Sequence, residues 1–141
     1  MMPLLMLLGL SVVIALAVYA WRLTRRVAEQ DVVRSQAIED SRQSVQILIG
    51  SYLQQQVDRS ECLLRTRVLL DASFADWRDA TSGHAFETVS NALLAMPFGQ
   101  ARAKLDTSQR QDQDATRRQL LQLHEKDLED ELKQLQEWIS K

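Results

Sequence analysis

The stretch SECLLRTRVLLD, Ser60 to Asp71, decides whether this chain is a helical scaffold or is built around a reactive thiol. It contains Cys62, the only cysteine in the sequence, within a run of apolar residues at helical spacing. Ser60 can accept a hydrogen bond from a first-turn N–H, so we expect it to be the N-cap of a helix. The pattern predicts a wide apolar surface made by Cys62, Leu63, Leu64, Val68, Leu69 and Leu70.

Charged residues in the same stretch occur in pairs four positions apart. Glu61 precedes Arg65, and Arg67 precedes Asp71, which is the spacing of neighbours on one helix face. Each such pair adds about 0.2–0.5 kcal/mol when it is exposed. Two roles stay open for Glu61 and Arg65: a buried charged pair that fixes helix packing, or part of a docking surface.

The thiol of Cys62 is the only candidate nucleophile of note. A helix N-terminus favours the thiolate, whereas the neighbouring charge of Glu61 opposes it. Only His84 and His124 could serve as a base, and neither is near Cys62 in the sequence. We therefore expect Cys62 to be a buried structural residue. The alternative is a thiol-based enzyme or redox sensor that uses Cys62. Without a second cysteine, no disulfide can form within the chain.

The rest of the sequence after Trp21 is also predicted to be helical, because strand-like alternation and hairpin dipeptides are absent. Val45, Leu48, Ile49, Tyr52 and Leu53 form one face of a first helix. Another helix is expected from Gly83 to Met96, where Pro97 ends it. A last helix should begin at Asp106 or Thr107, with Gln109 completing a capping box.

Apolar residues in the last helix follow heptad-like spacing, with Glu125 as an interruption. We expect this stripe to pack on the helices of its own domain, and a homodimer seam is the alternative. The members of the stripe are Leu121, Leu128, Leu132, Leu135 and Ile139. The acidic segment His124 to Glu131 is expected to be solvated surface.

The N-terminal stretch from Pro3 to Trp21 contains no charged residue and matches the length of a membrane-spanning helix. Arg22, Arg25 and Arg26 follow it, and basic flanks mark the cytoplasmic side. We therefore expect an all-α protein with a single transmembrane helix, N-terminus periplasmic, and a small cytoplasmic domain of about four helices. The predicted parts are the anchor at 1–21, a juxtamembrane helical stalk at 22–43 and the helical domain at 44–141.

Composition and motifs favour no catalytic, metal or cofactor site. Metal-ligand spacing and a Gly-rich phosphate loop are absent. The formal net charge of −2 makes a nucleic-acid partner unlikely. Arg110, Arg117 and Arg118 form a small basic cluster that Asp112 and Asp114 dilute. A weak nucleic-acid or lipid contact through these arginines is retained as an alternative.

Several of these segments together resemble the domain-of-unknown-function family 2489. The resemblance is carried by the anchor with its basic flank, by ILIGSYLQQQVDRSECLLRTRVLLD (Ile47 to Asp71) and by AMPFGQARAKL (Ala95 to Leu105). The core motif of the family is matched by Ser60, Glu61, Arg65, Leu69, Leu70 and Asp71, and its Met-Pro turn by Met96 and Pro97. The chain departs from the family around ECLLR, where the family often has an extra glycine. The resemblance implies a bacterial inner-membrane protein and no established activity.

These observations favour a non-enzymatic role. We expect a membrane-anchored interaction or scaffold module, or an accessory subunit of an inner-membrane complex. Its partners would be the membrane, through the N-terminal helix, and a protein that the sequence does not identify.

Overall fold

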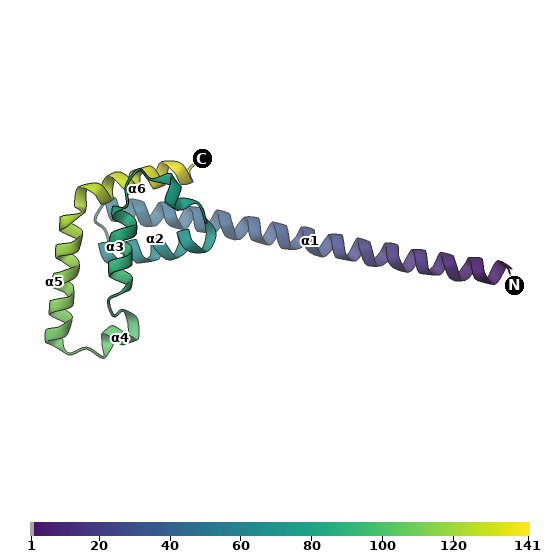
Figure 1. The fold of residues 1–141 in the computed structure, drawn as a ribbon, viewed down its shortest axis with the longest axis horizontal. Helices are drawn as coiled ribbons and strands as arrows, with labels where there is room; N and C mark the ends of the chain where they lie inside the picture. Colours follow the sequence, from purple (N-terminus) through teal and green to yellow (C-terminus); the bar gives the residue numbers. More distant parts are fainter. Residues whose placement is uncertain (1) are drawn as a thin grey trace. The chain divides into compact units, whose positions relative to one another are not determined.

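The computed structural model describes residues 2–141, with side chains from residue 13 onward, and every regular element in that range is helical (Figure 1). This confirms the all-α part of the predicted fold. The chain divides into two compact units, Met1–Glu39 and Asp40–Lys141. The elements are α1 (Met2–Leu53), α2 (Arg59–Ser73), the 3-10 helix η1 (Trp77–Ala80), α3 (Ala85–Leu94), α4 (Gly99–Ala103), α5 (Thr107–Leu123) and α6 (Glu125–Ile139).

The predicted membrane-spanning helix is not supported. Among the residues described with their side chains, no helix is both long enough and apolar enough to cross a membrane. The fold class with a transmembrane anchor is therefore corrected to an all-helical chain. Residues 3–12 of the predicted anchor lie outside the residues whose side chains are described.

The first unit consists of the N-terminal part of α1. Its described side chains up to Ala37 are exposed, apolar ones such as Trp21 and Val33 included. Arg25, one of the residues expected to set a membrane topology, makes two contacts within the helix. Its guanidinium lies 3.7 Å from Glu29 and 5.6 Å from the ring centroid of Trp21.

The second unit contains the apolar core. The last turns of α1 supply Val45, Ile49 and Tyr52, and the other helices close around them. The heptad-like stripe of the last helices is buried in this same core, which confirms that it packs on its own domain. The remaining buried apolar residues are Cys62, Leu63, Leu70, Trp77, Phe86, Val89, Leu93, Leu121, Leu128, Leu132, Leu135 and Ile139.

Three predicted helix boundaries are wrong. Asp58, rather than Ser60, is the N-cap of α2: its carboxylate accepts the N–H of Glu61 at 3.0 Å and the hydroxyl hydrogen of Ser60. The third predicted helix is shorter, because α3 ends at Leu94, before Pro97. The expected single last helix breaks at His124 into α5 and α6, although the predicted capping box of Asp106 and Gln109 is present.

The N-terminus of α3 is capped from another helix. The carboxylate of Glu131 in α6 accepts the backbone N–H groups of Ala85 at 2.8 Å and Phe86 at 2.9 Å. Glu131 is 5 % exposed, so the expectation of a fully solvated acidic segment is wrong at this residue. A side chain on Gly83 would collide with the Glu131 carboxylate, which explains the glycine at this position.

A second polar arrangement joins α2, η1 and α3 around Trp77. Arg67 is 6 % exposed; its Nε donates to Asp71 at 2.7 Å and its Nη1 to Ser90 at 2.9 Å. The Arg67 and Arg78 guanidiniums lie 4.9 and 4.5 Å from the Trp77 ring centroid, and the indole N–H donates to Asp71 at 2.9 Å. The i, i+4 pair of Arg67 and Asp71 is thus part of a larger network in which Arg67 and Trp77 are buried and Asp71 stays partly exposed.

Candidate functional site

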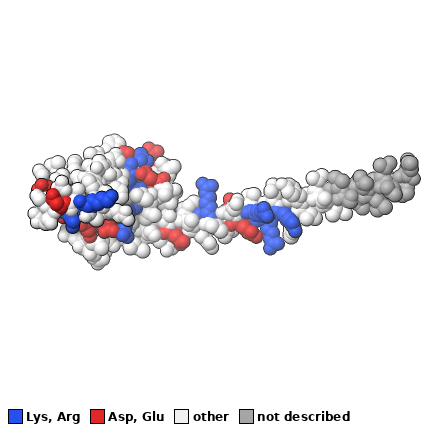
Figure 2. All heavy atoms as spheres, turned by 90° about the horizontal axis from the view of Figure 1, so that it is seen from below, with Lys and Arg blue, Asp and Glu red and all other residues white. Residues whose placement is uncertain are grey.

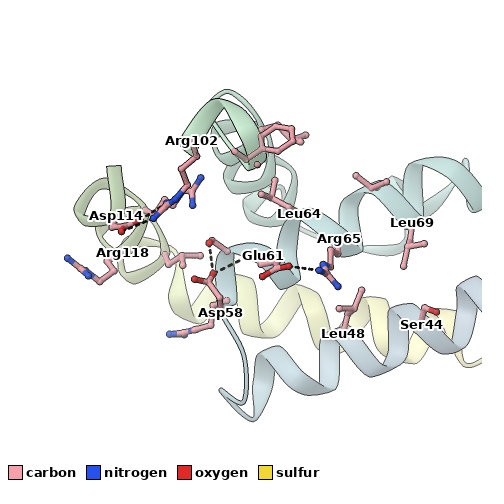
Figure 3. A pocket seen from close by; sticks show the side chains of 18 of the residues that line it. Ser44, Leu48, Asp58, Glu61, Leu64, Arg65, Leu69, Arg102, Asp114 and Arg118 are labelled. Carbon is pink, nitrogen blue, oxygen red and sulfur yellow. Dashed lines mark hydrogen bonds and ion pairs between the residues drawn. The ribbon is translucent and has the colours of Figure 1, made fainter. Parts of the chain in front are cut away.

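A groove of about 1240 Å³ opens in the second unit between the end of α1, α2, α4 and α5 (Figure 3). In Figure 1, α3 leads to α4, and α5 runs back from α4 to α6. Residues of α3, α4 and α5 line one side of the groove. The groove is lined by Ser44, Ile47, Leu48, Asp58, Arg59, Ser60, Glu61, Leu64, Arg65, Val68, Leu69, Leu94, Phe98, Gly99, Arg102, Asp114, Arg117, Arg118 and Leu121.

Large apolar side chains are exposed in this groove. Ile47 is 68 % exposed, Val68 58 %, Phe98 56 % and Leu94 38 %. They come from α1, α2, the turn before α4 and α3, so distant segments of the sequence bring them to one place. An exposed apolar patch with a polar rim is typical of an interaction surface.

The far wall of the groove is shaped by the turn at Pro97 and its attachment to α5. The carbonyl oxygen of Pro97 accepts two hydrogen bonds from α5, one from Gln113 Nε2 at 2.7 Å and one from Arg117 Nη2 at 3.1 Å. Gly99 has a φ of 57°, a backbone conformation that glycine adopts without strain. The Met-Pro turn is therefore the element that places Phe98 in the groove.

Ion pairs join the walls to the rest of the unit. Arg102 in α4 makes a two-point contact with Asp114 in α5, at 2.8 and 3.0 Å. At the other end, Arg59 donates to Glu125 at 2.7 and 3.0 Å and lies 5.1 Å from the ring centroid of Tyr52. Arg59 thus links α2 to α6, and Arg102 links α4 to α5. The charge of each arginine is compensated by its carboxylate partner.

Glu61 and Arg65, the predicted docking or packing pair, lie on the α2 side of the groove (Figure 3). They form an ion pair with each other, with side chains 59 % and 66 % exposed. A pair this exposed is not buried, so the alternative of a buried pair that fixes helix packing is wrong. Because both residues line the groove, a role of Glu61 and Arg65 in docking stays a prediction.

Cys62 faces the core and not the groove. It is 3 % exposed, which confirms the predicted burial. Burial raises the pKa of the Cys62 thiol, and the charges of Glu61 and Asp58 raise it further. A covered, protonated thiol is a poor nucleophile. Among the described residues, no group of three or more His, Cys, Asp or Glu side chains is placed to hold a metal ion.

The three arginines of the predicted basic cluster separate in the structure. Arg110 donates to the backbone carbonyls of Leu105 and Ala103, outside the groove. Arg117 and Arg118 both line the groove on the α5 side. Near them, hydrogen bonds led by that from the Ser60 hydroxyl lower the pKa of the Asp58 carboxyl, and the charge of Arg117 lowers it further.

The residues that expose the apolar surface were missed by sequence reasoning. Val68 was placed with its neighbours on one wide apolar surface of the helix, and Phe98 was treated only as part of a turn. A signal existed for Phe98: a large aromatic side chain directly after Pro97 and before Gly99 has no helical neighbours to cover it. No comparable signal exists for Val68, because its exposure depends on where α4 and α5 lie.

The size of the groove indicates the kind of ligand that it can accept. Sites for small molecules usually enclose about 300–1,000 Å³ and bury most of the ligand. The groove here is larger, and its exposed side chains are spread over four segments. Such a surface suits the apolar face of a helix, which is about 10–12 Å wide with its side chains.

No curated protein and no solved structure matches this sequence. The family model described as protein of unknown function (DUF2489) matches residues 13–135, which include α2, the Pro97 turn and all the residues that line the groove. This chain therefore belongs to the DUF2489 family.

Proposed function

We propose that this protein is a helical interaction module whose groove binds the apolar face of a helix from a partner protein. The observation that carries the proposal is the gathering of Ile47, Val68, Leu94 and Phe98, all exposed, in one groove. A bound helix would remove these side chains from water, at about 25 cal/mol per Å² of apolar area. The groove thus supplies a driving force for binding without any catalytic group.

A photo-crosslinking experiment tests this proposal in cells that make the protein naturally. A photoreactive phenylalanine analogue replaces Phe98 in the groove or, as a control, Leu123, which is 76 % exposed and outside it. We expect a discrete crosslinked product from position 98 and none from position 123. Mass spectrometry of the product then identifies the partner.

A groove variant makes the result specific. Val68→Asp adds a charge to the apolar surface at a side chain that is already 58 % exposed, so folding should be preserved. The product from position 98 should disappear in this variant, with an unchanged circular dichroism spectrum. No product at position 98, the same product from both positions, or a product that is a second copy of this chain would contradict the proposal.

A further inference from the structure

The groove carries a charge balance opposite to that of the whole chain. The sequence contains 19 acidic and 17 basic residues, for a net charge of −2. On the face seen in Figure 2, side chains of both signs are interspersed over the second unit. The groove, in contrast, is lined by five arginines and three carboxylates. One of the five, Arg59, is compensated by Glu125 outside the lining, so an acidic protein presents a small positive excess around its exposed apolar residues.

The three carboxylates of the groove are all occupied by contacts within the domain. Asp58 accepts hydrogen bonds at the N-terminus of α2, Glu61 pairs with Arg65, and Asp114 pairs with Arg102. Each has a partner that would have to be displaced before it could bind a cation from another molecule. The groove therefore offers no ready site for a basic partner.

Two of the arginines make no hydrogen bond or ion pair with a carboxylate of the described residues, although the charge of Arg117 acts on the Asp58 carboxyl. Arg117 donates to the neutral carbonyl of Pro97, and its Nε is buried without an acceptor. Arg118 is exposed and makes no hydrogen bond or ion pair with the described residues. Figure 3 shows Arg118 at the outer edge of the groove, beyond Asp114. Among the described residues, the positive charge that no carboxylate offsets is thus that of Arg118 on the α5 side, and Asp58 offsets part of the charge of Arg117.

From this arrangement we infer that the partner helix is acidic along one flank of its apolar face, and that this flank lies against Arg117 and Arg118. The inference rests on the proposed function and specifies the chemistry of the partner. Leucine-like side chains would contact Val68 and Phe98, and carboxylates would face α5. Rim charges of this kind act mainly on association rate, salt dependence and partner choice.

Two synthetic helical peptides test the inference directly. Each has about 14 residues, about 21 Å of helix, and the same leucines at i, i+3 and i+4 spacing. One carries Glu and the other Lys at the flanking positions, and both carry a fluorophore for anisotropy titration with the full chain. We expect the acidic peptide to bind about fivefold to tenfold more tightly at low salt. The difference should shrink as salt is added, because ions screen exposed charges.

Matched charge reversals locate the effect. Arg118→Glu should remove most of the preference for the acidic peptide. Lys133→Glu makes the same change of charge on α6, at an exposed position outside the groove, and should leave the preference intact. Val68→Asp should weaken the binding of both peptides.

The outcomes separate this inference from the proposed function. Equal binding of both peptides that Val68→Asp abolishes would overturn the acidic flank while leaving the groove as a helix-binding site. The same loss of preference in Arg118→Glu and Lys133→Glu would overturn the assignment to the α5 side. Binding of neither peptide, or binding that is insensitive to Val68→Asp, would overturn the inference and also count against the groove itself.

Discussion

The helices α3 and α6 are held together by buried side chains, whereas α4 and α5 are held mainly by polar contacts. Phe86, Leu132 and Leu135 are at most 1 % exposed where α3 and α6 meet. In contrast, α4, whose five residues are all described, contributes no buried residue, and Leu121 alone is buried in α5. Local opening costs least where few apolar contacts would be lost. The region that forms one wall of the groove is therefore the part of the domain most free to adjust.

Trp77 tests the buried side of this comparison most strongly. Trp77→Ala should lower the free energy of unfolding by about 3–5 kcal/mol, because it removes a large buried ring. It also leaves Asp71 without its indole donor. Urea unfolding followed by circular dichroism measures the loss. Phe98→Ala is the control and should change stability by less than about 0.5 kcal/mol, since the ring is largely exposed. Similar losses in the two variants would contradict the comparison.

Glu131 tests the cap that joins α6 to α3. Glu131→Ala should lower the free energy of unfolding by about 2–3 kcal/mol, because one buried and one partly buried N–H group lose a charged acceptor. Glu131→Gln keeps one acceptor oxygen and should lose roughly half as much. Gly83→Ala should also destabilise the domain, since its Cβ would displace the carboxylate. A Glu131→Ala variant as stable as the wild type would show that the cap contributes nothing.

Asp71 provides a test by pH. Burial raises the pKa of Asp71, but hydrogen bonds from Arg67 and Trp77, with the charges of Arg67 and Arg78, bring it below its ordinary value near 3.8. Because the folded-state pKa is the lower one, the stabilisation is present above about pH 4 and is lost as pH falls through the folded-state pKa. Asp71→Asn should therefore lose less stability than the wild type between pH 6 and pH 3, by urea midpoints. Parallel losses would contradict this assignment.

Arg102 tests the polar side, where the smallest effect is expected. Arg102→Ala should lower the free energy of unfolding by less than about 1 kcal/mol, because the ion pair with Asp114 is partly exposed. Amide hydrogen exchange over Gly99–Ala103 should nevertheless become faster, while exchange in α3 stays unchanged. Arg65→Ala removes an exposed pair within α2 and should alter neither. Unchanged exchange in α4 would mean that this ion pair does not hold the wall.

Local patterns in the sequence predicted the parts of the fold that depend on near neighbours. The apolar stripe from Leu121 to Ile139, the capping box at Asp106 and the burial of Cys62 follow from spacing and side-chain type. Arg67 was placed on the surface because an i, i+4 pair looks the same whether it is exposed or buried. The cap by Glu131 was missed because its partners lie about 46 residues away in the sequence.

The groove could not be predicted for the same reason. Its walls come from α1, α2, α4 and α5, and α4 and α5 reach the groove only after the chain turns at Pro97. Spacing marked Glu61 and Arg65 as a pair but gave no information about what lies opposite them. The anchor was the largest error of the fold prediction: it was inferred from an apolar run, of which only 13–21 carry described side chains.

The accessibility of the Cys62 thiol provides an intrinsic probe of core opening. Because it is the only thiol of the chain and is 3 % exposed, a thiol reagent can modify it only when α2 separates from the core. The labelling rate of Cys62 therefore reports how often α2 separates from the core. Since α2 also forms a side of the groove, a bound helix should lower the labelling rate of Cys62. Occupancy can thus be followed without attaching any reporter to the protein.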